Sequence, residues 1–411
     1  MSNIQPMTYL DNFIYLDNNA TTRIDPRVLD VMIPYLDEFY GNPSSIHRLG
    51  ARVGQALEIA REQVQQLLGA QHSSEVIFTS CATEATTTAI LSALEANPER
   101  REIVTSVVEH PATLQLCQNL ERKGYKVRWI GVDGKGNIDL EAYAQSLSEN
   151  VAIVSMMWAN NETGTLFPVE SMAMMAKTVG AQMHVDAVQV AGKRMINVHD
   201  TEIDMLSISG HKFHAPKGIG ALYLRRGTRF RPLLRGGHQE RGRRAGTENA
   251  ASAIAMGKAA ELAYKAIDTE LHRIKLLRDR LEQGLLARIP NTFVTGNPKQ
   301  RVANTTNIAV EFIEGEALLL MMNQVGIAAS SGSACTSGSL EPSHVMKAMK
   351  IPFTAAHGTL RFSLSRFTKD DDIDYVLEQL PPIVHRLRQM SPYWDNAANA
   401  GNVEEFAPTY A

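Results

Sequence analysis

The sequence predicts an α/β fold in which an open, mostly parallel sheet lies between helices and a smaller α+β domain follows. Six short runs rich in Val, Ile, Leu and Met lie between residues 74 and 226. Runs that are apolar on both faces are typical of buried parallel strands. Segments with apolar residues at helical spacing separate them, and this alternation is typical of a sheet with helices on both faces. After about residue 265 the pattern changes, which indicates the second domain.

The six apolar runs predict strands in the order in which they occur. Their sequences are SEVIFTS (74–80), REIVTSVV (101–108), VAIVSMMWA (151–159), AQMHVDA (181–187), IDMLSIS (203–209) and IGALYLRR (219–226). Helices are predicted over residues 82–97 and 168–180, the second of which ends at a glycine. In the second domain a long amphipathic helix is predicted over 268–289, with shorter strands over 305–313 and 359–365.

With 411 residues, the chain is too long for one compact domain under the usual size range, so two domains are expected. The larger domain is predicted over residues 15–264, and the smaller one over residues 1–14 together with 265–390. Residues 391–411 are rich in small and polar side chains, which favours a loosely attached C-terminal tail.

Composition excludes several classes of protein. No stretch approaches the roughly 18 apolar residues of a membrane helix, and the start MSNIQPMTYLDN lacks the order of a signal peptide, so a cytoplasmic protein is expected. A net charge of -3 gives no overall attraction to nucleic acid or to anionic membranes. The three cysteines, Cys81, Cys117 and Cys335, have no CxxC spacing. They support neither a disulfide framework nor a structural metal site and are expected to be reduced thiols.

Polar residues directly after the predicted strands are the first candidates for a site, because open α/β sheets bind ligands at the carboxyl ends of strands. Ala82 and Thr83 open a predicted helix whose free N–H groups could bind a phosphate; alternatively Thr83 is only an N-cap. His110 follows the second strand and, taken alone, is more simply a structural histidine. Asn160 and Asn161 follow the third and could orient an oxygen atom or merely satisfy a turn.

The fourth and fifth predicted strands end in HVDAVQ and SISGHKFHAPKGIG. They place Asp186, Gln189, Ser209, His211 and Lys212 at the same sheet edge. A lysine in a desolvated site can form a Schiff base. A carboxylate could then pair with a heteroaromatic nitrogen, while Ser and His groups support a phosphate. This combination indicates a site for pyridoxal phosphate.

Ten segments then identify a family resemblance that runs nearly end to end. They are YLDNNATT, GNPSSIH, TSCATE, VVEHPA, ANNETGT, HVDAVQ, SGHKFHAPKGIGALYLRR, RGGHQERGRRAGTEN, SSGSACTSGSLEPSH and RFSLSRF. In this order they resemble the pyridoxal-phosphate-dependent cysteine desulfurases of the class V aminotransferase family, and within it the nitrogen-fixation (Nif) type. The resemblance implies the architecture of a fold-type I pyridoxal-phosphate-dependent transferase.

The resemblance also implies roles for matching residues. Lys212 matches the lysine that holds the cofactor and moves the substrate's Cα proton. Asp186 matches the carboxylate that pairs with the pyridinium nitrogen, and His110 matches the acid–base histidine on the ring face. Arg361 matches the arginine that binds the substrate carboxylate, a task that suits its planar fork. The remaining matches are to residues that bind the cofactor: Ala82, Thr83, Asn161, Gln189, Ser209, His211 and Thr247. Among them, Asn161 is implied to lie near the substrate as well, and Thr247 to reach the cofactor from a second subunit of a homodimer.

Cys335, in the run SSGSACTSGS, matches the thiolate that takes sulfur from L-cysteine as a persulfide and leaves L-alanine. A thiolate is the nucleophile that this step needs, and the small residues around it fit a mobile loop. The resemblance implies a Nif-type iron–sulfur scaffold protein as sulfur acceptor, with nitrogenase as the destination. It implies no structural metal, although Cys335 could transiently ligate an iron–sulfur cluster.

Two alternatives stay open. A selenocysteine lyase or a transaminase could use the same fold, although a transaminase needs no thiol nucleophile. A nucleic-acid-binding or scaffold protein could use the arginine-rich residues 225–244. That segment has one aromatic residue, Phe230, among its arginines and the chain is acidic overall, so the segment is interpreted as a dimer interface or a cofactor-facing loop and no nucleic acid is expected as partner.

Overall fold

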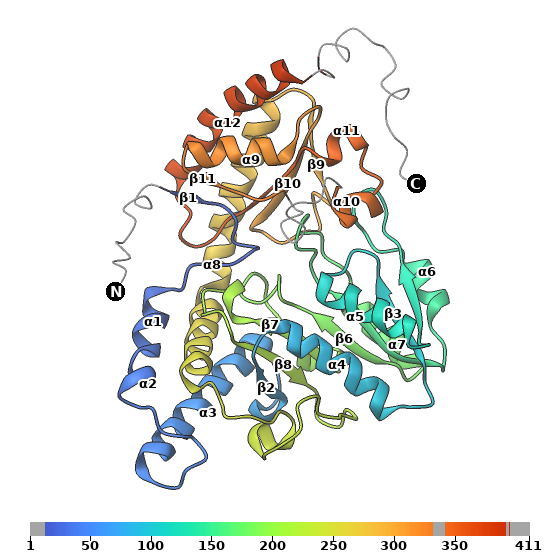
Figure 1. Cartoon of the computed structure of the whole chain (residues 1–411), viewed down its shortest axis with the longest axis vertical. Coiled ribbons are helices and arrows are strands. Elements are labelled where there is room, and N and C mark those ends of the chain that lie inside the picture. The colour runs from blue at the N-terminus through green and yellow to red at the C-terminus, as the bar shows by residue number, and fades with distance from the viewer. Residues whose placement is uncertain (1–12, 332–341, 392–393, 395–411) are drawn as a thin grey trace.

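The computed structural model describes residues 13–331, 342–391 and 394 of the chain. Its largest unit is a seven-stranded sheet in the order β2-β8-β7-β6-β5-β3-β4, seen in the lower half of Figure 1. β8 runs antiparallel to β2 and β7, and the other neighbouring strands run parallel. The strands are β2 (Val76–Thr79), β3 (Glu102–Ser106), β4 (Lys126–Ile130), β5 (Val151–Met157), β6 (Gln182–Asp186), β7 (Met205–Ser209) and β8 (Gly220–Leu224).

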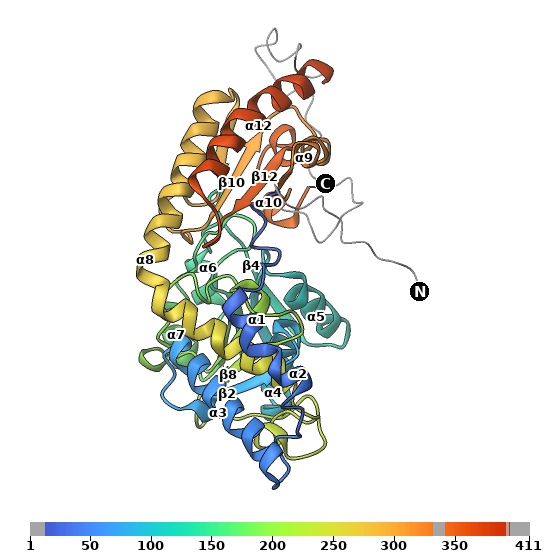
Figure 2. The same cartoon turned by 90° about the vertical axis from the view of Figure 1, so that its left-hand side faces the viewer.

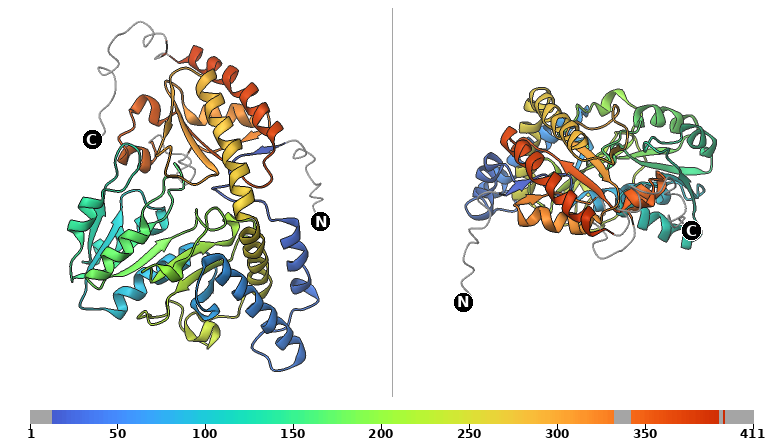
Figure 3. Two further views of the ribbon diagram at one scale, coloured as in Figure 1. Left: turned by 180° about the vertical axis from the view of Figure 1, so that it is seen from behind. Right: turned by 90° about the horizontal axis from the view of Figure 1, so that it is seen from above.

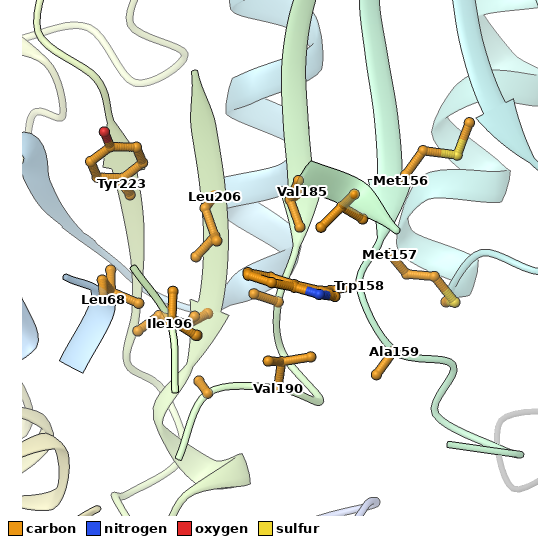
Figure 4. Close-up of a cluster of buried hydrophobic side chains, with 14 of the residues drawn as sticks. Leu68, Met156, Met157, Trp158, Ala159, Val185, Val190, Ile196, Leu206 and Tyr223 are labelled. Carbon is orange, nitrogen blue, oxygen red and sulfur yellow. The ribbon is translucent and has the colours of Figure 1, made fainter. Parts of the chain in front are cut away.

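Alternate side chains of this sheet enter two different cores. Val104 and Leu206 pack with residues of α3, α7 and α8, whereas Ile103 and Met205 pack with residues of α4 and α5. Figure 4 shows part of the first core, with Trp158 between Val185 and Val190. Helices therefore cover both faces of the sheet. Their bounds are α1 (Pro26–Met32), α2 (Pro34–Asp37), α3 (Arg48–Leu68), α4 (Ala82–Ala96), α5 (Pro111–Arg122), α6 (Leu140–Ser146), α7 (Val169–Thr178) and α8 (Ala250–Arg288).

A smaller unit, at the top of Figure 1, contains a three-stranded antiparallel sheet in the order β12-β10-β9 and a short parallel pair, β1 with β11. Its helices α9 and α12 share a third core with α8. The long helix α8 runs along one side of the molecule from the large sheet to this unit (Figures 2 and 3). The bounds are β1 (Ile14–Tyr15), β9 (Thr292–Thr295), β10 (Thr305–Val310), β11 (Ile327–Ala328), β12 (Thr359–Ser363), α9 (Gly315–Gln324), α10 (His344–Ala348), α11 (Phe353–Ala356) and α12 (Asp370–Met390).

The predicted fold class is confirmed, and each of the six predicted strands of the large sheet contains an observed one. The predicted start of the long helix was wrong. It begins at Ala250, capped by the Asn249 side chain, and not at residue 268. Residues 251–257 are all buried, so the helix has no polar face there and its first half shows no amphipathic period. The strand β4 was not predicted.

The proposed division into domains stays a prediction, and two observations bear on its boundaries. α8 continues without a break across residues 264 and 265. Leu16 packs in the core of the smaller unit, because β1 pairs with β11. Of the predicted tail, only Ser391 and Trp394 lie within the described residues.

In the part of the chain that the structure describes, no helix combines the length and apolar character that crossing a bilayer requires.

Candidate active site

Three parallel strands of the large sheet end beside one another and place the predicted polar residues at one edge. Asp186 is the last residue of β6, and Lys212 ends a 3-10 turn directly after β7. Asn161 follows β5, and β5 pairs with β6. The structure thus brings together residues that lie far apart in the sequence, because carboxyl ends of parallel strands meet at the same edge.

The Lys212 amine is held against the N-terminal segment of the chain. Its Nζ donates hydrogen bonds to the backbone oxygens of Asn19 (2.6 Å) and Ala20 (2.8 Å). This segment is fixed in turn, because Thr22 N donates to the backbone oxygen of His211 at 2.9 Å. The amine therefore has a defined position at the sheet edge.

Asp186 and His110 are electrostatically linked to Lys212. Burial raises the pKa of the Asp186 carboxyl, whereas the nearby His110 and Lys212 act in the opposite direction. His110 caps α5: its Nδ1 accepts a hydrogen bond from Ala112 N at 3.2 Å. Burial also lowers the pKa of His110, so its ring is neutral at pH 7, with the proton on Nε2. The charges of this amine, carboxyl and imidazole thus act on one another.

The N-terminus of α4 provides a cradle for an anion. The helix begins at Ala82, and its N-cap residue, Cys81, makes no side-chain hydrogen bond to it within the described structure. The prediction that Thr83 could be the N-cap is therefore wrong. Unpaired backbone N–H groups and the positive end of the helix dipole favour a phosphate here. Glu84 turns back to accept from Ser80 N at 2.8 Å and pairs with Arg244.

Gly220 of β8 allows this helix start to approach the sheet. A Cβ atom at Gly220 would lie 2.7 Å from the Cys81 carbonyl carbon and 3.0 Å from Ala82 N, both backbone atoms that cannot rotate away. We therefore expect Gly220→Ala to displace the start of α4 and to weaken pyridoxal phosphate binding about tenfold or more. Equilibrium titration of the apoprotein measures this. Gly131→Ala is the matched control, because a Cβ there meets no atom within 4 Å; equal affinities of the two variants would contradict the prediction.

The three other residues predicted to surround the phosphate lie in different surroundings: Ser209, His211 and Thr247. Ser209 ends β7 and is 3% exposed. The His211 Nδ1 lies 3.2 Å from the hydroxyl oxygen of Thr21. Burial, together with the neighbouring lysines, lowers the pKa of His211 to about 4, so this ring is neutral. Thr247 is exposed and lines a hollow with Ser80 and other residues near β2. Its contact with a second subunit's cofactor stays a prediction.

Arg361 reaches the site from β12 of the smaller unit. Its guanidinium is 3% exposed and donates from Nη2 to Asp17 Oδ1 at 2.7 Å and from Nη1 to the backbone oxygen of Asn161 at 3.0 Å. The Arg361 Nε has no partner among the described atoms. A guanidinium has five N–H donors, so these two contacts leave donors for a carboxylate. The Asn161 backbone thus joins the sheet edge to this arginine.

Four polar residues of the site were not predicted, three of them buried and Lys193 partly buried: Asn19, Lys193, Glu109 and Glu162. Asn19 lies within the motif YLDNNATT, and Lys193 follows Gln189 by four residues, at helical spacing. The Lys193 Nζ donates to Gln189 Oε1 at 2.8 Å and to Asn19 Oδ1 at 3.0 Å. Spacing was thus a signal for Lys193, whereas the position of Asn19 depends on tertiary contacts.

Glu109, next to His110, is 0% exposed. Its Oε1 accepts from Ser106 Oγ (2.7 Å) and Met157 N (3.0 Å), and Oε2 has no partner among the described atoms. Burial raises the pKa of this carboxyl to about 8. The folded protein therefore binds a proton here that the unfolded chain releases above its ordinary pKa of 4.5.

The consequence is a pH-dependent loss of stability. Because the pKa of Glu109 is higher in the folded than in the unfolded protein, protonation of Glu109 stabilises the fold. This stabilisation is complete below about pH 4.5 and decreases as the pH rises towards 8. Glu109→Gln cannot ionise, so we expect the wild type to lose up to about 4 kcal/mol of unfolding free energy relative to this variant between pH 5 and 9. Urea unfolding at several pH values measures the difference. A constant difference across this range would contradict the prediction.

Cys335 lies outside the described residues, but both flanks of residues 332–341 meet the site. The Arg361 N donates to the backbone oxygen of Ser330 at 2.6 Å. On the other side, Ser343 Oγ donates to Glu162 Oε2 at 2.6 Å, and His344 Nε2 lies 3.0 Å from the backbone oxygen of Glu109. Burial raises the pKa of Glu162 to about 7.

The donor set fits pyridoxal phosphate. An amine, a partly buried carboxyl, a neutral imidazole and an anion cradle at a helix start correspond to its aldehyde, ring nitrogen, ring face and phosphate. Among the residues that the structure describes, no group of three or more His, Cys, Asp or Glu side chains could hold a metal ion.

Comparison with known proteins agrees with this arrangement. The family described as aminotransferase class-V matches residues 14–376. The chain is 61% identical over 401 residues to the "Cysteine desulfurase NifS" of Azotobacter vinelandii, covering 97% of this chain and 99% of the relative. A "Cysteine desulfurase" of Gluconacetobacter diazotrophicus is also 61% identical, covering 97% of this chain and all of the relative. A solved "NIFS-LIKE PROTEIN" superposes with a TM-score of 0.86 at 36% identity, covering 92% of this chain and 100% of that one.

Proposed function

Because the chain belongs to the class-V aminotransferase family, we propose that it is a pyridoxal-phosphate-dependent cysteine desulfurase, which converts L-cysteine to L-alanine and transfers the sulfur to its own Cys335. The observation that carries the proposal is the placement of Lys212, Asp186 and His110 at or after the carboxyl ends of β7, β6 and β3, with Arg361 bonded to the Asn161 backbone beside them. The identity to two relatives named cysteine desulfurase, over nearly the whole chain, supports the choice of reaction.

Pyridoxal phosphate, when bound, supplies an electron sink that stabilises negative charge at the substrate's Cα. Lys212 would hold its aldehyde carbon and Asp186 would keep its ring nitrogen protonated, because a nearby negative charge favours the protonated form. The neutral His110 would face the ring. The phosphate would be held at the start of α4 and the other predicted positions would surround the ring and phosphate: Ala82, Thr83, Asn161, Gln189, Ser209 and His211.

Arg361 would bind the substrate carboxylate with the donors that Asp17 and Asn161 leave open, and Asn161 would lie near the substrate. The Lys212 amine, once released from the cofactor, would take the proton from Cα. The neutral His110 ring can accept or return a proton through its nitrogen atoms. Burial of these groups excludes water, which strengthens each of these electrostatic contacts.

Cys335 would act as the sulfur acceptor. Its thiolate attacks the substrate sulfur, the bond between that sulfur and the substrate's Cβ breaks, and the electron pair of that bond stays with the carbon, which takes up a proton to give alanine. The products are L-alanine and a persulfide on Cys335, so atoms and electrons balance. The contacts of Ser330, Ser343 and His344 with site residues support a position of the intervening segment near the cofactor.

The cellular setting is part of the same proposal. The enzyme would be a cytoplasmic homodimer in which Thr247 of each subunit reaches the other's cofactor. It would pass persulfide sulfur to an iron–sulfur scaffold protein of Nif type, for nitrogenase. The name of the Azotobacter vinelandii relative supports this destination. The exposure of Thr247 is compatible with a contact to a second subunit.

The reaction is tested by incubating the purified holoenzyme with L-cysteine and a thiol reductant. We expect alanine and sulfide to appear in equal amounts. A transaminase would release a 2-oxo acid and leave sulfur on carbon, and a dedicated selenocysteine lyase would act on L-selenocysteine while leaving L-cysteine unchanged. Either result would overturn the proposed reaction. A protein without cofactor absorbance would overturn the enzyme class and favour a binding protein.

A further inference from the structure

Lys193 is a partly buried lysine to which the proposed reaction assigns no role. It lies in the turn after β6, where Lys193 N donates to the backbone oxygen of Val190 at 2.8 Å. The preceding Gly192 has a φ of +71°, and a Cβ there would lie 3.0 Å from the Cβ of Phe213. A glycine is thus needed to bring the turn against the segment that carries Lys212.

Two hydrogen bonds fix the Lys193 amine. Its Nζ donates to Gln189 Oε1 at 2.8 Å and to Asn19 Oδ1 at 3.0 Å. The Lys193 amine is the donor and the Gln189 Oε1 the acceptor in the first of these contacts, so the Gln189 oxygen faces Lys193. The Gln189 Nε2 then points the other way and donates to the Asn19 backbone oxygen at 3.0 Å. Lys193 therefore determines the orientation of the Gln189 amide.

Asn19 extends this arrangement to Lys212 and to the smaller unit. The same Asn19 backbone oxygen that accepts from Gln189 also accepts from Lys212 Nζ. The Asn19 side chain donates to Thr305 Oγ1 at 2.8 Å, and its oxygen accepts from Asn304 Nδ2 at 3.1 Å. Asn19 is thus held from both sides, by Lys193 and by residues around the start of β10.

We propose that Lys193 is a positioning residue for the cofactor site. It fixes the amide of Gln189 and the side chain of Asn19, so that one N–H of Gln189 and the amine of Lys212 meet at the Asn19 backbone oxygen while the second N–H of Gln189 stays available to the cofactor ring. The inference rests on the proposed function, in which Lys212 holds pyridoxal phosphate.

Charge at this position matters as well as geometry. The charged and titratable groups that act on Lys193 or are acted on by it are Lys212 and His211 of the turn after β7, His214 beyond that turn, and Arg361 of β12. Burial, and then the positive charges of Lys212 and Arg361, lower the pKa of Lys193 well below its usual value. Removing the Lys193 amine removes the donor that orients Gln189. A misplaced Gln189 N–H no longer stabilises negative charge on the cofactor ring, and this favours a more strongly protonated group at Lys212. Where Lys193 carries its proton, its removal also removes a like charge near Lys212, which acts in the same direction.

The test is a pH titration of the cofactor's visible absorbance band in Lys193→Met, which keeps most of the length of the side chain without its donor. We expect the apparent pKa of the band to rise by about half a unit or more, and the dissociation constant of pyridoxal phosphate, measured with apoprotein, to rise about fivefold or more. Lys177→Met is the matched control, because Lys177 is exposed and pairs with Glu202 away from the site; it should leave both values unchanged.

Lys193→Gln is the second variant, since its amide retains an N–H donor and is expected to fold even where Lys193→Met does not. Its shift should have the same sign and be smaller. Wild-type values of the band pKa and of cofactor affinity in Lys193→Met, or in Lys193→Gln if only that variant folds, would overturn the inference. Absence of a visible band from the wild type itself would instead overturn the proposed function.

Discussion

Lys212→Ala is expected to lose covalent attachment of the cofactor and at least about 10³-fold of the turnover rate. The variant lacks the amine that holds the aldehyde carbon and moves the Cα proton, and one positioned acid–base group alone contributes about 10²–10⁴-fold. The measurement is borohydride reduction of the holoenzyme followed by peptide mass spectrometry. In the wild type the reduced cofactor should be found on Lys212.

Lys177→Ala is the control for this prediction, because this exposed lysine forms an ion pair with Glu202 away from the sheet edge. It should keep the absorbance band and the turnover rate. Reductive fixation of the cofactor to another lysine in the wild type, or an unchanged turnover rate in Lys212→Ala, would contradict the role of Lys212.

Arg361→Ala is expected to lower kcat/KM for L-cysteine by about 10²–10³-fold, mainly through KM. The variant loses the guanidinium that we assign to the substrate carboxylate, and it leaves Asp17, 2.7 Å from the guanidinium, without its partner. Removing one member of a fully buried charge pair costs about 2–5 kcal/mol, and less is expected here because the Asp17 side chain is 20% exposed. Arg361→Lys keeps the charge, but its single Nζ cannot reproduce the two contacts to Asp17 and Asn161, so we expect an intermediate value.

Two comparisons separate substrate binding from stability. Arg301→Ala removes a buried arginine that pairs with Glu282 at 2.6 Å, so it should lower stability with little change in KM. Cysteamine, which lacks the carboxylate, should be a poor substrate for the wild type. The preference for L-cysteine over cysteamine should narrow in Arg361→Ala, and an unchanged preference would exclude Arg361 from carboxylate binding.

The sequence predicted the sheet edge better than the rest of the molecule, and the reason is physical. Asp186 and Lys212 follow apolar runs of parallel strands, and the ends of such strands meet at one edge whatever the length of chain between them. Asn19 could not be assigned in this way. Its place depends on Thr305 and Ser363, which lie hundreds of residues away in the sequence and contact it directly.

The start of α8 shows a different limit. Residues 250–267 are rich in alanine and buried on most sides, so periodicity does not reveal a helix that α3 and the large sheet cover. Glu109 was also not predicted, since a glutamate beside His110 is expected at the surface unless the fold is known to bury it. Burial, rather than residue type, makes this carboxyl unusual.

The central claim is that Cys335 accepts the substrate's sulfur atom after the cofactor site has weakened the bond between that sulfur and carbon. Single turnover without reductant tests it most directly: holoenzyme is mixed with one equivalent of L-cysteine, alanine is measured, and the peptide that carries Cys335 is analysed by mass spectrometry. We predict one alanine for each added sulfur atom on Cys335, and neither product at a comparable rate in Cys335→Ala. Equal alanine and sulfide formation by wild type and Cys335→Ala, with no sulfur added to Cys335, would contradict the account.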